Sequence, residues 1–222
     1  MDAETVMKLL DVKESYQVPD KLMKIMFDKD KRENLFRKFL EITTDVSFDW
    51  FHEYFETAQA DRKEKKQDFT PQSIARIANE ITGEGHTYFE SACGTGGMLI
   101  TRWHNDCMKT PPFAYKPSMF FYQVEELSDA AMPFLIFNCL IRGMNAVILH
   151  GDSLSREVKD VYFIQNPKDS YTAFSDLNVM PRSETVKKYF GVKEWVGNPI
   201  EHIEDKTTPK YLGGVLNDKK QA

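Results

Sequence analysis

A glycine-rich corner is the part of the chain whose residue types and spacing are best suited to chemistry. Residues 89–100 read FESACGTGGMLI, with three glycines within four residues directly before an apolar run. Such turns from a strand into a helix bring backbone N–H groups close to the polar parts of a ligand. The corner therefore predicts a ligand site, and three kinds of ligand have to be compared.

Two phosphate-binding interpretations fit this corner poorly. A Walker loop needs G-x-x-x-x-G-K-[ST], and no lysine follows these glycines. A dinucleotide fingerprint needs G-x-G-x-x-G; Gly94 and Gly96 match its first two positions, but Leu99 occupies the third. The remaining interpretation is a loop that wraps the amino-acid end of S-adenosyl-L-methionine.

Acidic side chains follow the next two predicted strands. Glu125 and Glu126 come after a strand predicted over 118–124, and Asp152 ends a strand predicted over 145–152. An acid just beyond the second strand can hydrogen-bond both hydroxyls of a ribose, and Glu125 is the predicted ligand. Alone, Asp152 is also typical of a helix N-cap.

The sequence GDSL at 151–154 also has a competing interpretation as a serine-esterase signature. Ser153 would then be the nucleophile. Those enzymes place the signature at the first strand and pair it with a later Asp-x-x-His. Here the signature follows other ligand elements, and His202 has no aspartate three residues before it. An esterase is therefore disfavoured.

Alternating strand and helix patterns would position these residues. Strands are predicted over 87–91, 118–124, 145–152 and 160–165. Three helices are predicted: one that begins at Pro71, one that directly follows the glycine corner, and one over 129–143. Strands alternating with helices form a parallel sheet covered by helices, which predicts an α/β fold.

The first sixty residues predict a separate helical module. Two aromatic-rich stripes recur at helical spacing: Leu35, Phe36, Phe39 and Leu40, then Trp50, Phe51, Tyr54 and Phe55. Such stripes are typical of packing between helices. The mixed-charge run that follows is typical of a linker. The predicted division is a helical module (1–60), a linker (61–67), an α/β domain (68–200) and a tail (201–222).

Composition argues against several function classes. The net charge is −5, whereas a protein that grips duplex DNA alone usually carries a basic face. The longest apolar runs are too short to span a bilayer, and the first residues do not resemble a secretory signal. Three cysteines and five histidines lie scattered. We therefore expect a cytoplasmic protein with no membrane association and no metal site.

The glycine corner and the sequence DFTP at 68–71 together resemble the adenine-N6 DNA methyltransferases, most closely the modification subunits of type I restriction systems. Glu90 stands at the acidic position of their first motif, and the cofactor loop corresponds to Ala92, Cys93, Gly94, Thr95, Gly96 and Gly97. Their F/Y-T-P element, which lies against the methionine part of the cofactor, corresponds to Phe69, Thr70 and Pro71.

The resemblance implies S-adenosyl-L-methionine as cofactor and DNA as methyl acceptor. It places Glu125 at the ribose and Asp152 at the exocyclic amine of the cofactor's adenine, with Ser153 and Leu154 beside it. The implied fold is a Rossmann-like methyltransferase sheet preceded by the helical module. Because little sequence follows the fourth predicted strand, a shortened sheet is expected.

The catalytic element of these enzymes is Asn/Asp/Ser-Pro-Pro-Tyr/Phe after the fourth strand. Its polar side chain accepts hydrogen bonds from the target amine, and its aromatic ring stacks on the flipped base. Asn166 and Pro167 match two positions, and the candidate for stacking is Tyr171 or, as an alternative, Phe174. Lys168 replaces the second proline and Asp169 the aromatic residue. A weaker second candidate is GNPI at 197–200.

Two functions remain after this comparison. One is a compact adenine-N6 methyltransferase with weak or partner-dependent activity. Type I modification subunits rely on a separate specificity subunit to read the DNA sequence, so a homo- or hetero-oligomer is compatible with this interpretation. The other is a non-catalytic S-adenosyl-L-methionine-binding protein used for regulation or complex formation. The altered catalytic element and negative charge favour the second function, and the glycine loop favours cofactor binding under either.

Overall fold

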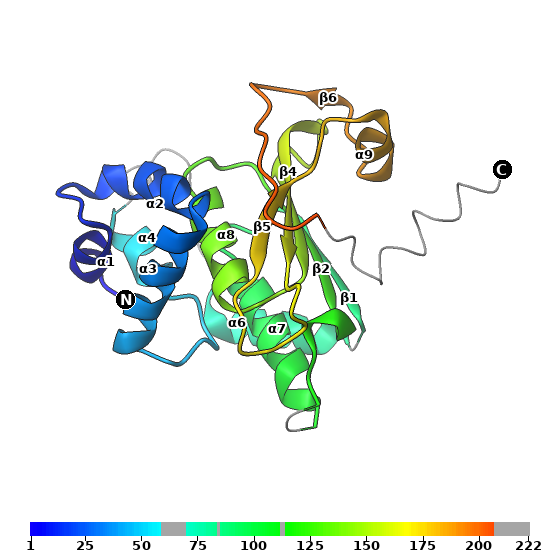
Figure 1. Cartoon of the computed structure of the whole chain (residues 1–222). Coiled ribbons are helices and arrows are strands. Elements are labelled where there is room, and N and C mark those ends of the chain that lie inside the picture. Colours follow the sequence, from blue (N-terminus) through cyan, green and yellow to red (C-terminus); the bar gives the residue numbers. More distant parts are fainter. Residues whose placement is uncertain (59–69, 84, 112–113, 207–222) are drawn as a thin grey trace.

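Figure 1 shows a computed structural model, which describes residues 1–58, 70–83, 85–111 and 114–206. The predicted linker 61–67, Phe69 and the end of the predicted tail (207–222) lie outside the described residues. The helices are α1 (Ala3–Leu10), α2 (Val18–Met26), α3 (Lys29–Ile42), α4 (His52–Ala58), α6 (Gln72–Thr82), α7 (Gly97–Lys109), α8 (Met132–Ile141) and α9 (Glu184–Tyr189). The strands are β1 (Thr87–Glu90), β2 (Phe121–Glu126), β3 (Ala146–Gly151), β4 (Glu157–Gln165), β5 (Asp176–Val179) and β6 (Glu194–Trp195).

Strands β1, β2 and β3 form the parallel part of the sheet. They lie side by side in this order, with β1 at the edge of the described sheet (Figure 1). Helix α7 connects β1 to β2, and α8 connects β2 to β3. Parallel strands need crossovers of this kind. The predicted α/β fold with helices between parallel strands is confirmed.

The fourth strand departs from the predicted parallel arrangement. Strand β4 pairs antiparallel with β3, and β5 pairs antiparallel with β4. Only residues 152–156 link β3 to β4, whereas a parallel connection needs a crossover of about a dozen residues or more. The carboxyl end of β4 therefore lies on the side of the sheet where β1, β2 and β3 begin, opposite to the side where those three strands end.

A glycine permits the tight reversal between β3 and β4. A Cβ atom at Gly151 would lie 2.3 Å from the carbonyl oxygen of Glu157, closer than real side chains approach backbone. The register of the two strands also shifts between His150 and Gly151. Gly151 of the GDSL sequence is thus required by strand packing, whatever ligand lies nearby.

Helix α8 lies at the centre of the main core, between the sheet and the N-terminal helices (Figure 1). All ten of its residues are buried. The ring of Phe137 lies with its centroid 4.8 Å from that of Phe36 and 4.9 Å from those of Phe39 and Phe51. The prediction that the aromatic stripes pack between helices is confirmed, and they pack on α8 as well.

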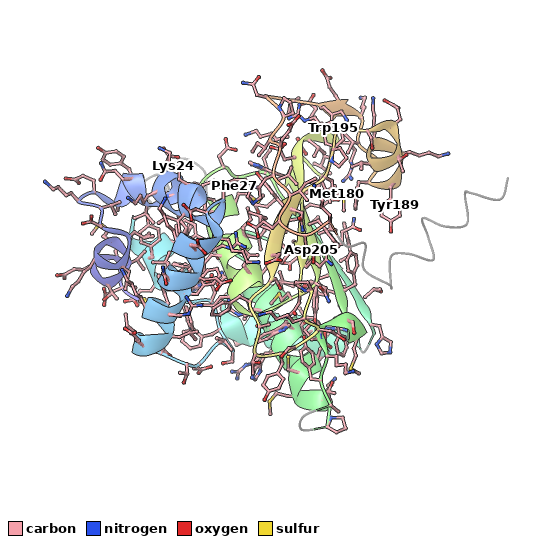
Figure 2. All side chains as sticks on the ribbon, viewed as in Figure 1. Lys24, Phe27, Met180, Tyr189, Trp195 and Asp205 are labelled. Carbon is pink, nitrogen blue, oxygen red and sulfur yellow. The ribbon has the colours of Figure 1, made fainter. Side chains whose placement is uncertain are left out.

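The first residues of the predicted tail belong to the folded body. Glu204 forms a two-point ion pair with the fully buried Arg32 and accepts a hydrogen bond from the N–H of Leu177 at 2.9 Å. The ring of His202 packs edge-on against Phe27, with centroids 5.0 Å apart. Figure 2 labels Phe27 and Asp205, which mark the two segments joined here. Residues 201–206 therefore connect the N-terminal helices to β5.

The other face of the sheet carries a smaller core beneath α9. Its buried members are Val147, Leu149, Val158, Val161, Phe163, Phe190 and Val192. Met180 and Trp195, labelled in Figure 2, pack at its margin. Across the described ranges, no helix is both long and apolar enough to cross a membrane.

Helix α6 turns three isoleucines outward. Ile74, Ile77 and Ile81 are 51%, 53% and 80% exposed. The buried residues of α6 are Ala75 and Asn79, and the Asn79 side chain donates to the carbonyl oxygen of Met98 in α7 at 3.3 Å. The helix exists as predicted, but it packs through its smaller residues.

Candidate functional site

The glycine corner turns sharply between β1 and α7, as predicted. Ala92, Gly94 and Gly96 have φ angles of 56°, 61° and 98°, in the left-handed region that favours glycine. A Cβ atom at Gly96 would lie 3.0 Å from Cδ1 of Leu135 in α8. The loop therefore fits closely over α8, and a larger residue at Gly96 would have to displace it.

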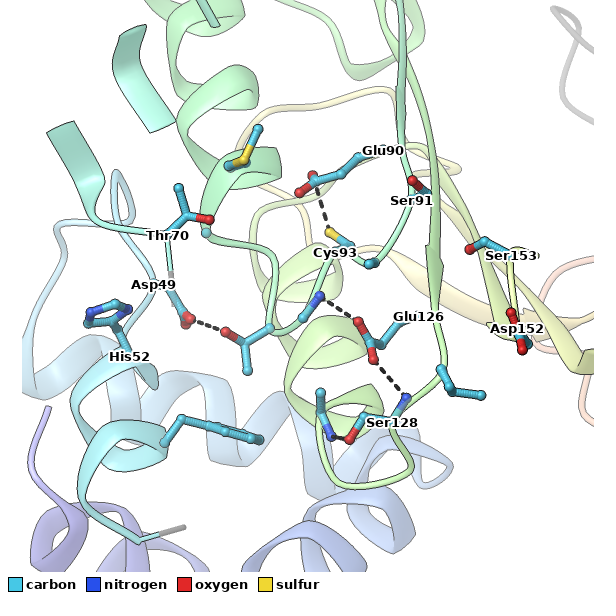
Figure 3. A pocket seen from close by; sticks show the side chains of 18 of the residues that line it. Asp49, His52, Thr70, Glu90, Ser91, Cys93, Glu126, Ser128, Asp152 and Ser153 are labelled. Carbon is cyan, nitrogen blue, oxygen red and sulfur yellow. Dashed lines mark hydrogen bonds between the residues drawn. The ribbon is translucent and has the colours of Figure 1, made fainter. Parts of the chain in front are cut away.

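A cavity of about 710 Å³ lies at the carboxyl ends of β1, β2 and β3 (Figure 3). Its volume is typical of small-molecule sites, and this edge of a parallel sheet is where such folds bind ligands. The cavity brings together most of the predicted cofactor residues: Thr70, Glu90, Ala92, Cys93, Gly94, Thr95, Gly97, Asp152, Ser153 and Leu154. Pro71 and Gly96 flank lining residues without lining the cavity themselves.

The lining of this cavity is acidic. It includes the carboxylates of Asp49, Glu90, Glu126 and Asp152, and no lysine or arginine stands among its described residues. The N–H of Gly94 donates to Oε2 of Glu126 at 2.6 Å, so this loop amide is already satisfied by a carboxylate. Both features favour a cationic ligand and disfavour the phosphates of the Walker and dinucleotide interpretations.

Glu90 lies at the base of the cavity with two side-chain donors. The Tyr88 hydroxyl donates to its Oε2 at 3.0 Å, and the Cys93 thiol donates to the same atom at 3.3 Å. Burial raises the pKa of Glu90 to about 7, with the Glu126 charge adding to the rise and both donors opposing it. Burial likewise raises the pKa of Cys93 well above its usual value. Glu90 therefore gains and loses its proton near neutral pH, whereas Cys93 stays a neutral donor.

The structure places Glu126, and not Glu125, at the cavity. Glu125 is 2% exposed, and its carboxylate is bound by Arg156 at 2.7 Å on the other side of β2. Glu126 lines the cavity and accepts from the N–H of Ser128 at 2.7 Å (Figure 3). Neighbouring residues of a strand point to opposite faces, so a choice between adjacent acids depends on register.

Asp152 caps the turn between β3 and β4 while it lines the cavity. Its Oδ1 accepts from the N–H of Leu154 at 2.8 Å and of Ser155 at 3.3 Å. These backbone hydrogen bonds lower the pKa of Asp152. Figure 3 shows Asp152 and Ser153 across the cavity from Asp49. The chain continues from this turn into β4, so Asp152 caps a turn and not the predicted helix N-terminus, and the same residue lines the cavity.

The esterase interpretation finds no support in the placement of His202. Its Nε2 lies 2.8 Å from Oε1 of Glu204, beside α2. It does not line the cavity that contains Ser153.

The predicted catalytic residues Asn166 and Pro167 lie at the opposite edge of the sheet from this cavity. They follow β4, whose direction is reversed by the short link from β3. Asn166 is 5% exposed, and its Nδ2 donates to the carbonyl oxygens of Gly143 at 3.1 Å and Ser170 at 2.8 Å. Its side-chain amide stabilises the turn after β4, so the structure does not bring the predicted catalytic residues to this cavity.

The other candidates for base recognition also lie away from the cavity. Tyr171 is 55% exposed in the loop after β4, on the same edge as Asn166. Asn198 of the second candidate sequence follows β6, which pairs with the beginning of β4. Neither residue is among those that line the cavity.

Several cavity residues were not predicted from the sequence. Asp49 reaches the cavity from the segment between α3 and α4, His52 and Phe55 reach it from α4, and Ser128 reaches it from the turn after β2. The first three fall in an aromatic-rich stretch whose pattern indicates only core packing. Within the described part of the chain, no cluster of three or more His, Cys, Asp or Glu residues could hold a metal ion.

Comparison with known proteins bears directly on the family. The model of the N-6 DNA methylase family matches residues 44–182, more than half of the chain. No curated protein matches. Among solved structures, a modification subunit of a putative type I restriction enzyme from Vibrio vulnificus YJ016 aligns with a TM-score of 0.40 and 16% identity, over 59% of this chain and 27% of that chain. The chain thus spans about a quarter of that subunit's length. The predicted family is confirmed: the chain belongs to the N-6 DNA methylases.

Proposed function

We propose that this chain binds S-adenosyl-L-methionine in the acidic cavity. The observation that carries the proposal is a lining with four carboxylates and no lysine or arginine among the described residues. S-adenosyl-L-methionine brings a sulfonium and an ammonium group, both positive. An acidic site attracts such a ligand and repels nucleotides that carry phosphates.

We propose specific roles for three of the carboxylates. Glu90 accepts hydrogen bonds from the ammonium group, and this requires it to be ionised. Glu126 receives the ribose hydroxyls in place of Glu125, because its side chain is the one that faces the cavity. Asp152 receives the exocyclic amine of the cofactor's adenine, with its Oδ1 held by the N–H of Leu154.

We propose further that methyl transfer is directed to N6 of adenine in DNA and depends on groups from outside the described residues. The target amine has to lose a proton, which calls for acceptors beside the methyl group. The Asn–Pro pair that resembles such an element lies at the opposite edge of the sheet. A partner protein that supplies these acceptors and the reading of DNA sequence satisfies this requirement, and the complex acts in the cytoplasm.

The placement of Asn166 also favours a second function, a non-catalytic module that binds the cofactor for regulation or complex formation. The two functions share the cofactor and differ only in methyl transfer. Both predict binding by the isolated chain, and only the first predicts N6-methyladenine in DNA when the partner is present.

Calorimetric titration with S-adenosyl-L-methionine and S-adenosylhomocysteine tests the shared step. We expect binding of both, and weaker binding by Glu126→Gln than by Glu125→Gln. Absence of heat for both ligands at millimolar concentration would refute cofactor binding. Mass spectrometry of N6-methyladenine in DNA from cells that express the chain, with and without neighbouring genes, then separates the methyltransferase from the binding module.

A further inference from the structure

The glycine loop is held from below by a buried polar network. Nδ2 of Asn138 in α8 donates to Oδ1 of Asp49 at 2.9 Å and to the carbonyl oxygen of Thr95 at 2.8 Å. The Thr95 hydroxyl donates to Oδ2 of Asp49 at 2.5 Å. None of the three residues is more than 6% exposed. Both the backbone and the side chain of Thr95, the loop residue of this network, are therefore fixed by partners outside the loop.

The network continues into the segment that leads from α3 to α4. We call residues 45–51 the strap. Arg142, at the end of α8, donates to the strap carbonyl oxygens of Val46 at 2.9 Å and Phe48 at 2.8 Å, and to Oδ1 of Asn138 at 2.8 Å. Its guanidinium also lies 5.7 Å from the centroid of the Trp50 ring. The strap is thus bound to the same helix that supports the glycine loop.

The buried positive charge of Arg142 makes the polar network depend on the carboxylate of Asp49. Arg142 is 3% exposed, and burial lowers its pKa to about 10, whereas the charge of Asp49 opposes that change. A buried guanidinium is costly without a compensating charge. Asp49 therefore serves two partners at once: the Thr95 hydroxyl directly, and Arg142 through Asn138 and the electrostatic field.

The loop needs such support because its backbone is unfavourable in isolation. Ala92 has a φ angle of 56°, a region that residues with a Cβ atom avoid. Backbone of this kind persists only where surrounding contacts fix it. Figure 3 labels Asp49 at the cavity with a dashed line to its hydrogen-bond donor, which is the hydroxyl of the loop residue Thr95.

We propose that Asp49 is a positioning residue for the cofactor site: through Thr95 it holds the glycine loop in the shape that receives S-adenosyl-L-methionine. This inference rests on the proposed cofactor binding. By linkage, a bound cofactor also stabilises the docked strap, because coupling between two sites acts equally in both directions. The N-terminal helices thereby contribute to cofactor affinity even through residues that do not touch the cofactor.

Substitutions at Thr95 provide the sharpest test with the full-length chain. Thr95→Val removes the hydroxyl and keeps the shape, whereas Thr95→Ser keeps the hydroxyl. We expect Thr95→Val to weaken S-adenosylhomocysteine binding by about 10-fold, a typical coupling between sites. Thr95→Ser keeps the hydroxyl that donates to Asp49 and should therefore lose less affinity than Thr95→Val. Thr101→Val is the matched control, because it removes another buried hydroxyl that bonds within α7, to the carbonyl oxygen of Gly97 at 3.0 Å.

Hydrogen exchange of the ligand-free protein gives a readout that does not depend on cofactor. In Thr95→Val and Asp49→Asn, the amides of residues 91–98 should exchange faster, while those of β2 and β3 stay as in the wild type. In the wild type, saturating S-adenosylhomocysteine should slow exchange in the strap. Equal affinities for Thr95→Val and Thr101→Val, or unchanged exchange of residues 91–98, would overturn the inference.

The two proposals fail in different ways. If the wild type binds neither S-adenosyl-L-methionine nor S-adenosylhomocysteine, the proposed function is refuted, and so is the role of Asp49 in it. If the wild type binds and Thr95→Val binds equally well, only the positioning role is refuted.

Discussion

Replacing Glu90 with glutamine should increase the stability of the ligand-free protein at alkaline pH. Burial raises the pKa of Glu90 from 4.5 to about 7, so ionisation is costly in the folded state. Between these two values the folded protein retains a proton that the unfolded chain has released, and the free energy of unfolding falls as pH rises. Above pH 7 the accumulated loss is about 3 kcal/mol, from about 1.4 kcal/mol for each unit of pKa. Glutamine is uncharged and avoids this loss.

Chemical denaturation of the wild type and Glu90→Gln at pH 5 and pH 8 measures this difference. We expect similar unfolding free energies at pH 5, and at pH 8 a gain of up to about 3 kcal/mol for the variant. Glu80→Gln, at an exposed position of α6, is the control and should show no such gain. The reasoning would be refuted by a Glu90→Gln effect of equal size at both pH values, since a pH-independent change cannot come from ionisation.

The remaining predictions concern cofactor binding, the C-terminal segment and the tight strand reversal. The proposed contact between ionised Glu90 and the cofactor's ammonium group predicts that affinity for S-adenosyl-L-methionine falls by up to about 10-fold per pH unit below pH 7; calorimetry should find a much flatter profile in Glu90→Gln. Glu204→Ala removes the two-point partner of the buried Arg32 and leaves it the Asp176 carboxylate at 4.0 Å, so the free energy of unfolding should fall by about 3–5 kcal/mol. Exposed Glu201→Ala should change it by less than about 0.5 kcal/mol, and equal effects would contradict the burial argument. Gly151→Ala forces a Cβ atom against β4 and should lower the melting temperature in a thermal scan; an unchanged melting temperature would show that the strands separate easily.

Local patterns were sufficient to predict the elements that build the acidic cavity. The glycine corner, the strand before it and the helix after it are continuous in sequence, so their geometry follows from a few adjacent residues. The same holds for Asp152 at the end of β3. The sequence did not indicate that Glu126, and not Glu125, lines the cavity, because a shift of one residue moves a side chain to the other face of a strand. Apolar alternation is too weak at the end of β2 to fix that register.

The position of Asn166 could not be read from its own motif. An apolar strand followed by Asn-Pro looks the same whether the strand runs parallel or antiparallel to its neighbour. Direction is set by the link from β3, which has room for a tight turn and no helix. The length of residues 152–156 was therefore the informative feature, and it lies before the motif and not within it.

Contacts between distant segments account for the other missed residues. Asp49 reaches Thr95 and Asn138, which follow it by 46 and 89 residues, and no local pattern marks such a partnership. Helix α8 is buried on all sides, so it needs cover from the sheet and from the N-terminal helices together. The division predicted at residue 60 thus separates groups that share one core. The family match beginning at residue 44 includes the strap and leaves out the three helices before it. A fragment that starts at residue 68 would lack Asp49. It would also lack the carbonyl groups of Val46 and Phe48, to which Arg142 donates its hydrogen bonds. The glycine loop, the strap and α8 therefore form one unit of folding and of the proposed binding.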